Sequence, residues 1–433
     1  MPSGNTTVTA AAGPETLCQH ALVAPGPSAL KRDGVCVFGL TARERLERTF
    51  SKLGLMPLDP LSLGDVRSKR AIVLCGDYFF DERLIAALAD QSEAVMLVID
   101  EPGRGGVVVG LAGCVAEIEE FLPAIGAEDV LSENVSMRQV SPIDLVPAYD
   151  AKLRKHSPPY VLPVDSERAL ETEKRIFAAS FKGATDFVTK FVWPLPARIV
   201  TGWCARRRIT PNMVTGLSYV LTFLALVAFW RGDFAIGLLS GWSMTFLDTV
   251  DGKLARVTLT STKLGDVLDH GLDLVHPPFW WAAWAVGLVA LGGLPAPIGA
   301  SILAGPGNLF GPYAFWVAVV VGGYVAGRLL EGVFMLGFGQ EMFTWRPFDF
   351  GFRHVIARRN PNLVMLSLAT LFGRPDLGFI AVGIWTLACL LIQCERIAQA
   401  AILRMRGQAI RPFAESLDSI EPIDAADSLS NQA

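Results

Sequence analysis

Long apolar runs between about residues 211 and 405 constrain this chain more than any other feature. A helix needs ~20 such residues to cross the hydrocarbon core of a bilayer. We expect six spans, near 212–230, 233–254, 266–292, 312–337, 360–373 and 376–403. The fifth run is short, so that segment would be tilted or covered by its neighbours. Hydrophobic residues make up 51% of the 433 residues, which also favours an integral membrane protein over a soluble one.

The charges between the runs predict an orientation. The loop 293–312 carries no charge, whereas arginines crowd the loop 338–360 and flank the first and last spans. Cytoplasmic loops are the ones enriched in Lys and Arg. We therefore expect a multi-pass protein of a bacterial-type inner (plasma) membrane, with its N-terminal domain, C-terminus and active site in the cytoplasm. The net charge of −4 gives no sign of a nucleic-acid partner.

Residues 31–160 show the strand–helix alternation of an α/β domain. Short apolar runs predict strands at 35–40, 71–76, 94–100 and 106–113, and helical spacing predicts helices at 41–54 and 81–90. Thr41 suits the N-cap of the first helix. The alternation predicts a small, mostly parallel sheet. The flanking tails 1–30 and 407–433 have the composition of disordered segments, the second one acidic.

A connector, 161–210, joins this domain to the transmembrane domain 211–406. Residues 166–181 have helical spacing, and 185–208 mix Phe, Trp and Val with Lys and Arg. That mixture is typical of an amphipathic helix lying in the lipid headgroup region. The alternative is a soluble helix that packs on the N-terminal domain.

Four aspartates within 248–273 form the most informative pattern. Asp248 and Asp251 are spaced i,i+3, so they share one face of a helix. Asp269 and Asp273 are spaced i,i+4 on the following helix. Two helices would thus each offer two carboxylates to one location near the cytoplasmic surface.

Ionised carboxylates at membrane depth are costly, at ~2.5–3.5 kcal/mol each even on the low-end scale. Divalent cations remove that cost, and ligands that are all oxygen select Mg²⁺ or Mn²⁺. A pair of such ions suits a pyrophosphate donor. Small Gly252 and Ala255 would let a nucleotide approach the helix, and Arg256 can bind phosphate oxygens.

Single aspartates at the ends of spans are usually helix caps or surface charges. Here eight specified residues stand at fixed spacing, for which a chance match is on the order of 10⁻¹⁰ per start position at ordinary residue usage. A functional site explains the pattern better than chance does.

The eight-residue pattern resembles the full signature of the CDP-alcohol phosphotransferase (phosphatidyltransferase) family, and no position departs from it. It reads Asp248-x2-Asp251-Gly252-x2-Ala255-Arg256-x8-Gly265-x3-Asp269-x3-Asp273. The run Thr210-Pro211-Asn212-x2-Thr215 is also similar to that family. The resemblance covers about 185–405. It implies a six-helix membrane fold, a homodimer, and transfer of a substituted phosphate from a CDP-alcohol to an alcohol, with release of CMP.

The resemblance also implies roles for single residues. Asp248, Asp251, Asp269 and Asp273 would bind the metal, and Asp273 would also be the catalytic base. The nucleotide would be bound by Asp248, Gly252, Ala255, Arg256 and Gly265.

Arg328 and Glu331 lie within the fourth predicted span, where charged residues suggest function. They would either pair with each other, or Arg328 would face the cavity and bind an anionic acceptor such as a polyol phosphate. Arg353, Arg358 and Arg359 offer the same alternatives of phosphate binding or a plain role in topology.

Residues 73–88 are similar to the strand-plus-aspartate region of nucleotidyltransferase domains, with Asp77 at the metal-binding place. Residues 182–212 resemble the junction in enzymes that fuse an inositol-phosphate cytidylyltransferase to this membrane domain. The GxGxR loop that holds the triphosphate is missing, however, and transfer is hard to support without its backbone amides. We therefore expect a degenerate, non-catalytic or regulatory domain, with a bifunctional enzyme as the alternative.

The sequence thus predicts a multi-domain protein, with a degenerate nucleotidyltransferase-like α/β domain followed by an all-α six-helix transmembrane domain. Its function would be CDP-alcohol phosphotransfer in phospholipid or phosphoinositol-type biosynthesis. The donor would be of the CDP-diacylglycerol or CDP-inositol type. The fusion-like architecture favours inositol phosphate, while glycerol 3-phosphate remains open. The rival from another class is a cation transporter, and a membrane scaffold is a third option.

Overall fold

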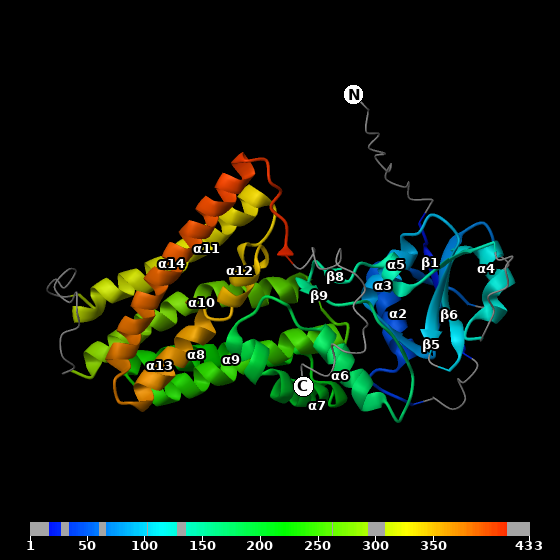
Figure 1. Cartoon of the computed structure of the whole chain (residues 1–433). Coiled ribbons are helices and arrows are strands. Elements are labelled where there is room, and N and C mark those ends of the chain that lie inside the picture. The colour runs from blue at the N-terminus through cyan, green and yellow to red at the C-terminus, as the bar shows by residue number, and fades with distance from the viewer. Residues whose placement is uncertain are drawn as a thin grey trace. The chain divides into compact units, whose positions relative to one another are not determined.

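The computed structural model describes residues 17–26, 34–59, 66–101, 103–127, 136–261, 263–292 and 308–413 (Figure 1). Within α10, the side chains of residues 263, 264, 266–270, 272 and 273 lie outside this description. The chain divides into two compact units. An N-terminal unit comprises Met1–Ala148 and Ser157–Ala179, and a helical unit comprises Tyr149–His156 and Ser180–Ala433.

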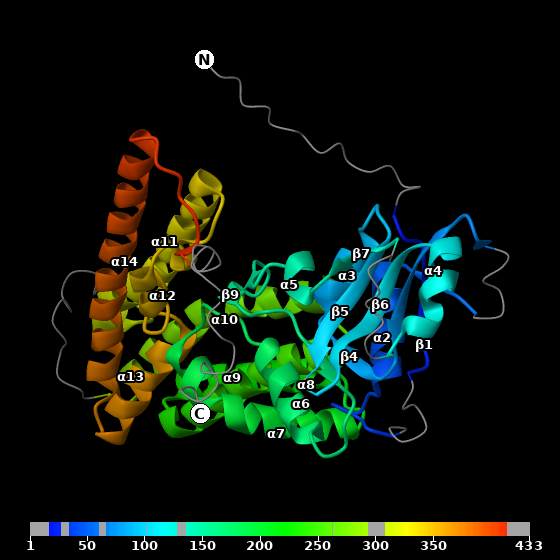
Figure 2. The ribbon, with the colours of Figure 1, turned by 45° about the vertical axis from the view of Figure 1, so that its right-hand side comes forward.

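A six-stranded sheet forms the centre of the N-terminal unit, in the order β2-β1-β3-β6-β5-β7 (Figure 2). Its strands are β1 His20–Ala24, β2 Met56–Pro57, β3 Arg70–Cys75, β5 Val95–Glu101, β6 Gly105–Cys114 and β7 Arg138–Val140. Only β6 pairs antiparallel with its neighbours β3 and β5. The other pairs are parallel, so the prediction of a mostly parallel sheet is confirmed.

Helix α2 (Ala42–Leu53) begins as its sequence predicts. The Thr41 hydroxyl accepts a hydrogen bond from the Glu44 amide at 3.2 Å, and the Glu44 carboxylate accepts one from the Thr41 amide at 2.7 Å. This capping box satisfies two amides that the helix itself leaves unpaired. Helix α3 (Glu82–Ala89) begins after Asp81, whose side chain caps the helix by accepting a hydrogen bond from the Arg83 amide.

Two predictions for the N-terminal unit are wrong. Strand β1 lies inside 1–30, which we expected to be disordered, because its short apolar run HALVA is buried between β2 and β3. Residues 35–40 form no strand. Phe38 and Gly39 adopt left-handed backbone angles there, so that Val37 and Leu40 only bridge each other.

The remaining elements of residues 78–179 are short. Strand β4 (Tyr78–Phe80) pairs with β10 (Val161–Pro163), and β8 (Tyr149–Asp150) pairs with β9 (Lys155–His156). The helices are α4 Val115–Phe121, η2 Leu122–Ala124, α5 Pro142–Leu145 and α6 Ala169–Ala179. The sequence-based boundary at residue 160 therefore falls inside the N-terminal unit, whereas β8 and β9 belong to the helical unit.

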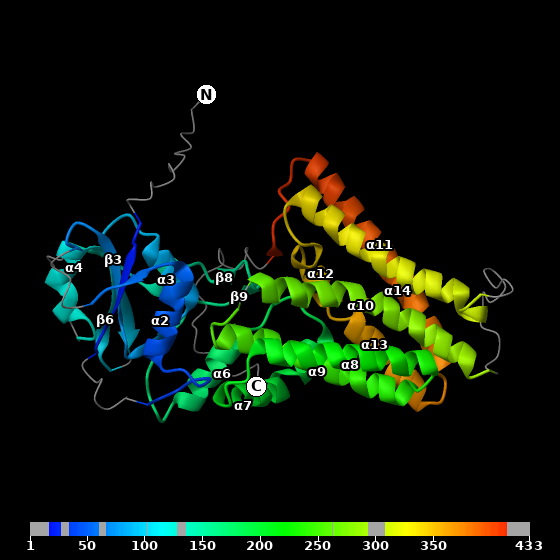
Figure 3. The ribbon, with the colours of Figure 1, turned by 180° about the vertical axis from the view of Figure 1, so that it is seen from behind.

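The helical unit contains a helix at each predicted span (Figure 3). These helices are α8 Pro211–Arg231, α9 Phe234–Val257, α10 Lys263–Ala290, α11 Ala314–Phe338, α13 Arg359–Leu371 and α14 Pro375–Met405. Among the residues that the structure describes, three stretches are long and apolar enough to cross a membrane, namely Pro211–Arg231, Gly311–Phe338 and Pro375–Met405. Of the other three helices, α9 carries Asp248 and Asp251, α10 has a described apolar stretch at Leu274–Ala290, and α13 has 13 residues.

Short elements connect these helices. They are η3 Val188–Val192, α7 Pro194–Arg206, η4 Gly311–Tyr313, η5 Met342–Thr344 and α12 Pro347–Phe352. Along η3 and α7, a stripe of large apolar side chains recurs at every fourth residue. Each is at least half exposed: Phe187, Phe191, Leu195, Ile199 and Trp203. An apolar stripe with this spacing lies along one face of a helix, which supports the amphipathic pattern predicted for 185–208.

Candidate active site

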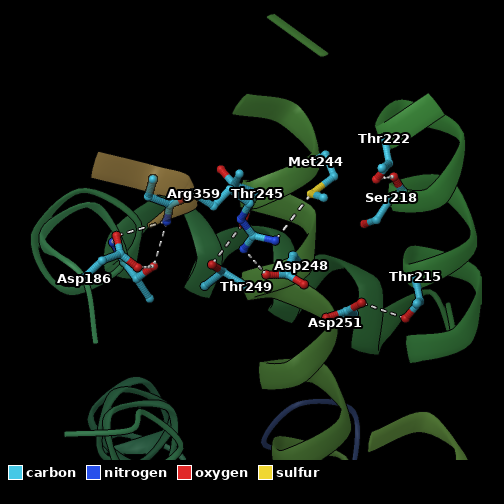
Figure 4. Close-up of polar contacts among 12 residues, drawn as sticks. Asp186, Thr215, Ser218, Thr222, Met244, Thr245, Asp248, Thr249, Asp251 and Arg359 are labelled. Carbon is cyan, nitrogen blue, oxygen red and sulfur yellow. Dashed lines mark hydrogen bonds and ion pairs between the residues drawn. The ribbon is translucent and has the colours of Figure 1, made fainter. Parts of the chain in front are cut away.

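Helix α9 places Asp248 and Asp251 one turn apart, and each carboxylate has a distant partner (Figure 4). One oxygen of Asp248 lies 2.5 Å from a guanidinium nitrogen of Arg359, at the start of α13. Asp251 is 4% exposed, and its Oδ2 accepts a hydrogen bond of 2.6 Å from the Thr215 hydroxyl on α8. Three helices therefore fix the orientation of the two carboxylates.

Thr215 belongs to the Thr-Pro-Asn run that precedes the first apolar helix. Thr210 caps α8 by accepting a hydrogen bond from the Met213 amide. Pro211 occupies the first helical position, where its missing N–H costs nothing. One turn further on, the Thr215 hydroxyl oxygen also lies 3.0 Å from the Pro211 carbonyl oxygen. The run thus sets the start of α8, which in turn places the Thr215 hydroxyl beside Asp251.

The second pair of aspartates lies on α10. Gly265 is partly exposed in the first turn of that helix. The positions of Asp269 and Asp273 lie within α10, but their side chains are outside the described part of the chain. The convergence of all four carboxylates on one location therefore stays a prediction.

A cavity of about 640 Å³ opens beside α9 within the helical unit. Ligand pockets typically have volumes of ~300–1,000 Å³. Of the residues predicted for the site, Asp248, Gly252, Arg256 and Arg328 line this cavity. Asp251, Ala255 and Gly265 are not among its described lining residues.

The cavity has an excess of positive charge. Among its described lining residues, eight are Lys or Arg and four are Asp or Glu. The basic ones are Arg154, Lys182, Lys253, Arg256, Arg328, Arg353, Arg358 and Arg359. An excess of cations inside a cleft attracts anions and concentrates them there. Phosphate-bearing substrates fit this charge distribution.

Three of these arginines gather around Glu331 on α11. Its Oε2 lies 3.2 Å from Arg328 and 2.5 Å from Arg358. The pairing of Arg328 with Glu331 considered for the fourth span is therefore observed, although both residues also line the cavity. Burial lowers the pKa of Arg353, a shift that Asp186 and Glu331 oppose, and it lowers the pKa of Arg358, a shift that Glu331 opposes. A buried cation is costly to keep charged unless it is paired, so an anion bound in the cavity would stabilise this group.

The structure adds site residues that sequence patterns did not indicate. Lys253 is 4% exposed on α9, with its ammonium 3.6 Å from the centre of the Phe181 ring and 3.3 Å from the Ser180 carbonyl. Asp186 accepts a hydrogen bond from the Asn360 side chain at 3.0 Å. Lys253 lies within the aspartate pattern, at a position that the pattern leaves open. Lys253 and Ser180 lie far apart along the chain, as do Asp186 and Asn360, so no local sequence pattern could indicate that they meet.

The donor atoms present suit a hard cation. Asp248 and Asp251 offer only oxygen ligands, as Mg²⁺ and Mn²⁺ prefer. Among the residues with described side chains, no three His, Cys, Asp or Glu residues are grouped to hold a metal ion. Asp269 and Asp273 are outside that set.

The fold and the site together define a class of protein. An α/β unit is followed by a helical unit with three helices apolar enough to span a membrane, and that unit encloses a basic cavity beside an aspartate-bearing helix. A model of the CDP-alcohol phosphatidyltransferase family matches residues 208–328. The match supports a membrane-bound transferase of this kind and covers the whole aspartate pattern. No curated protein matches the chain.

Proposed function

We propose that the protein is a membrane CDP-alcohol phosphotransferase. It transfers a substituted phosphate from a CDP-alcohol to an alcohol acceptor and releases CMP, in phospholipid or phosphoinositol-type biosynthesis. One observation carries the proposal: the complete eight-residue aspartate pattern lies in the segment that matches the family, and its α9 half borders a basic cavity.

The carboxylates form the donor side of the site. Asp248, Asp251, Asp269 and Asp273 would hold Mg²⁺ or Mn²⁺, with two ions expected. When bound, these ions neutralise a diphosphate and stabilise CMP as the leaving group. Arg359 and Thr215 orient the two carboxylates of α9 before substrate arrives, and such outer partners tune metal affinity.

The turn after Asp251 receives the nucleotide. Gly252 borders the cavity, and a Cβ at this position would lie 3.2 Å from Nη2 of Arg256. A larger side chain would therefore push the Arg256 guanidinium out of place. Ala255 also has a small side chain, so Gly252 and Ala255 leave room for the nucleotide on this face of α9. Arg256 donates hydrogen bonds to the phosphate oxygens of the nucleotide.

Asp273 is the proposed base. It takes the proton of the acceptor hydroxyl while the acceptor oxygen forms a bond to the phosphorus that carries the donor alcohol. The bond from this phosphorus to the bridging oxygen breaks, and that oxygen leaves with CMP. The excess of arginines over acids in the cavity stabilises the charge that develops on the phosphate oxygens.

The acceptor binds near Arg328. Arg328 and Arg358 both pair with the single carboxylate of Glu331, and Arg353 lies near the same group, so positive charge remains for an anionic acceptor. A polyol phosphate such as inositol phosphate has this chemistry, and glycerol 3-phosphate is the other candidate. The donor would be of the CDP-diacylglycerol or CDP-inositol type.

The apolar stripe of η3 and α7 supports the membrane placement. Its exposed side chains, with Lys190 and Arg198 nearby, have the character of a helix lying at the headgroup level. The remaining helices would complete a six-span fold with a cytoplasmic active site. A homodimer is expected from the family resemblance.

An Asp273→Asn variant tests the proposal. The amide keeps the size of the side chain but cannot accept the proton, so CMP release from a CDP-alcohol with a polyol phosphate acceptor should be abolished. Binding of the CDP-alcohol should remain measurable by calorimetry. Wild-type turnover in this variant would rule out Asp273 as the base, and no CMP release from the wild-type protein with any acceptor would overturn the proposed function.

A further inference from the structure

A short hairpin, β8 and β9 (Tyr149–His156), belongs to the helical unit although the chain on either side of it belongs to the N-terminal unit. The chain thus leaves one unit, contributes eight residues to the other, and returns. Such an excursion is unusual for a plain linker, since domain boundaries normally have few contacts across them. The contacts of the hairpin show what it does in the helical unit.

Two hydrogen bonds hold the tip of the hairpin in place. The Leu153 amide donates to the Asp150 carboxylate at 2.9 Å. The Gly183 amide donates to the Leu153 carbonyl at 2.7 Å. A Cβ at Gly183 would lie 2.1 Å from the Arg154 carbonyl oxygen, so only glycine allows the segment before η3 to approach the hairpin so closely.

Arg154 occupies an uncommon conformation at this tip. Its φ is +56°, in the left-handed region that residues with a Cβ rarely adopt. Its guanidinium forms an ion pair with Glu341, and both residues line the cavity. Uncommon backbone angles of this kind cluster at functional sites, where the surroundings enforce them.

We propose that this hairpin is a wall of the active-site cavity and that Arg154 binds a phosphate group of a substrate. In the structure, the Glu341 carboxylate pairs with the Arg154 guanidinium. A phosphate can also accept two hydrogen bonds from one guanidinium, as a carboxylate does, and it carries a higher charge. It therefore competes with Glu341 for Arg154 when substrate enters. The inference rests on the proposed function for the identity of the substrate.

The phosphate could come from the donor or from the acceptor. Both carry phosphate oxygens, and both Asp248 and Glu331 line the same cavity. Separate probes distinguish the two sources, namely CDP for the donor diphosphate and inorganic phosphate for the acceptor. The alternative is that Arg154 has only a structural role, in which its ion pair with Glu341 attaches the hairpin to η5.

Equilibrium binding to the full-length protein tests the inference without any need for turnover. We expect Arg154→Ala to weaken binding of one probe by about 10-fold to 100-fold, as loss of a charge-assisted hydrogen bond implies. Arg154→Lys should recover part of that loss. Glu341→Gln should bind the same probe more tightly than the wild type, because it removes the competing carboxylate. Arg168→Ala is the matched control, since that side chain is exposed at 70% and lies in the N-terminal unit.

The results separate this inference from the proposed function. If Arg154→Ala binds both CDP and inorganic phosphate as the wild type does, the inference is overturned, whatever the turnover. A merely structural role predicts that Arg154→Ala and Glu341→Gln weaken binding and lower thermal stability together, and that result also overturns it. Absence of CMP release from the wild type bears only on the proposed function.

Discussion

At the residue scale, the partners of the aspartates matter as much as the aspartates themselves. Asp251 is almost fully buried, and a buried carboxylate without hydrogen bonds would be costly. The Thr215 hydroxyl on the neighbouring helix supplies one such bond at 2.6 Å. A metal ligand held in this way is oriented before the ion binds.

We predict that Thr215→Val weakens Mn²⁺ binding by about 10-fold to 100-fold, as removal of an outer-shell partner usually does. Thr215→Ser, which keeps the hydroxyl, should bind like the wild type. Electron paramagnetic resonance of free Mn²⁺ measures the affinity. Thr222→Val is the control, because the Thr222 hydroxyl donates to the Ser218 carbonyl of its own helix (Figure 4). Equal affinity in Thr215→Val and the wild type would contradict the role of Thr215.

Spacing alone could predict that Asp248 and Asp251 share a helix face, because a helix repeats every 3.6 residues. It could not predict their partners. Thr215 lies 36 residues from Asp251, and Arg359 lies 111 residues from Asp248. Contacts of that kind depend on how whole helices pack, which no local pattern encodes. Asp269 and Asp273 remain predictions from spacing and resemblance.

At the element scale, glycines allow the helices of the site to pack closely. Gly287 on α10 faces the end of α8, where a Cβ would lie 2.1 Å from the Phe229 carbonyl oxygen and 2.9 Å from Gly232. Gly237 on α9 packs in the same way against the Phe229 ring. Small residues at such crossings let helix backbones approach within membranes. These contacts hold α8, α9 and α10 together, and α9 carries Asp248 and Asp251.

Gly287→Ala should lower the melting temperature in detergent, because the added methyl group forces α8 and α10 apart at a cost of roughly 1–3 kcal/mol. Tryptophan fluorescence can follow the transition, since Trp280, Trp281 and Trp284 are buried on the same helix. Gly322→Ala on α11 is the matched control, as a Cβ there meets nothing within 4 Å. A variant of Gly287 that melts with the wild type would show that the close approach contributes no stability.

The helices of the second unit were predictable because apolar runs and their breaks mark them directly. The N-terminal unit was harder. β1 was missed because its five residues lie in a segment rich in Ala, Pro and Gly. Residues 35–40 were mistaken for a strand because a buried apolar run does not reveal a turn with left-handed residues such as Phe38.

At the scale of the whole molecule, the N-terminal unit raises the question of a second activity. Its sheet and Asp77 are present, and Asp77 is buried. The GxGxR loop that would hold a nucleoside triphosphate is missing from the sequence. The prediction from the sequence, a unit that does not carry out cytidylyl transfer, can be tested directly.

The full-length protein, given CTP, Mg²⁺ and a polyol phosphate, should release no pyrophosphate. The same preparation should release CMP from a supplied CDP-alcohol, which shows that it is active. Pyrophosphate release that depends on the polyol phosphate would instead establish a bifunctional enzyme.

The proposed active site requires carboxylates from both α9 and α10 to bind the same ions. Mn²⁺ affinity measured for Asp251→Asn, Asp269→Asn and the double variant tests this directly. We predict that each single variant loses more than the about 10-fold to 100-fold expected for an outer-shell partner, and that the double variant loses little more than either one, because both act on the same ions. Wild-type affinity in Asp269→Asn would show that α10 takes no part in the site and would contradict the account.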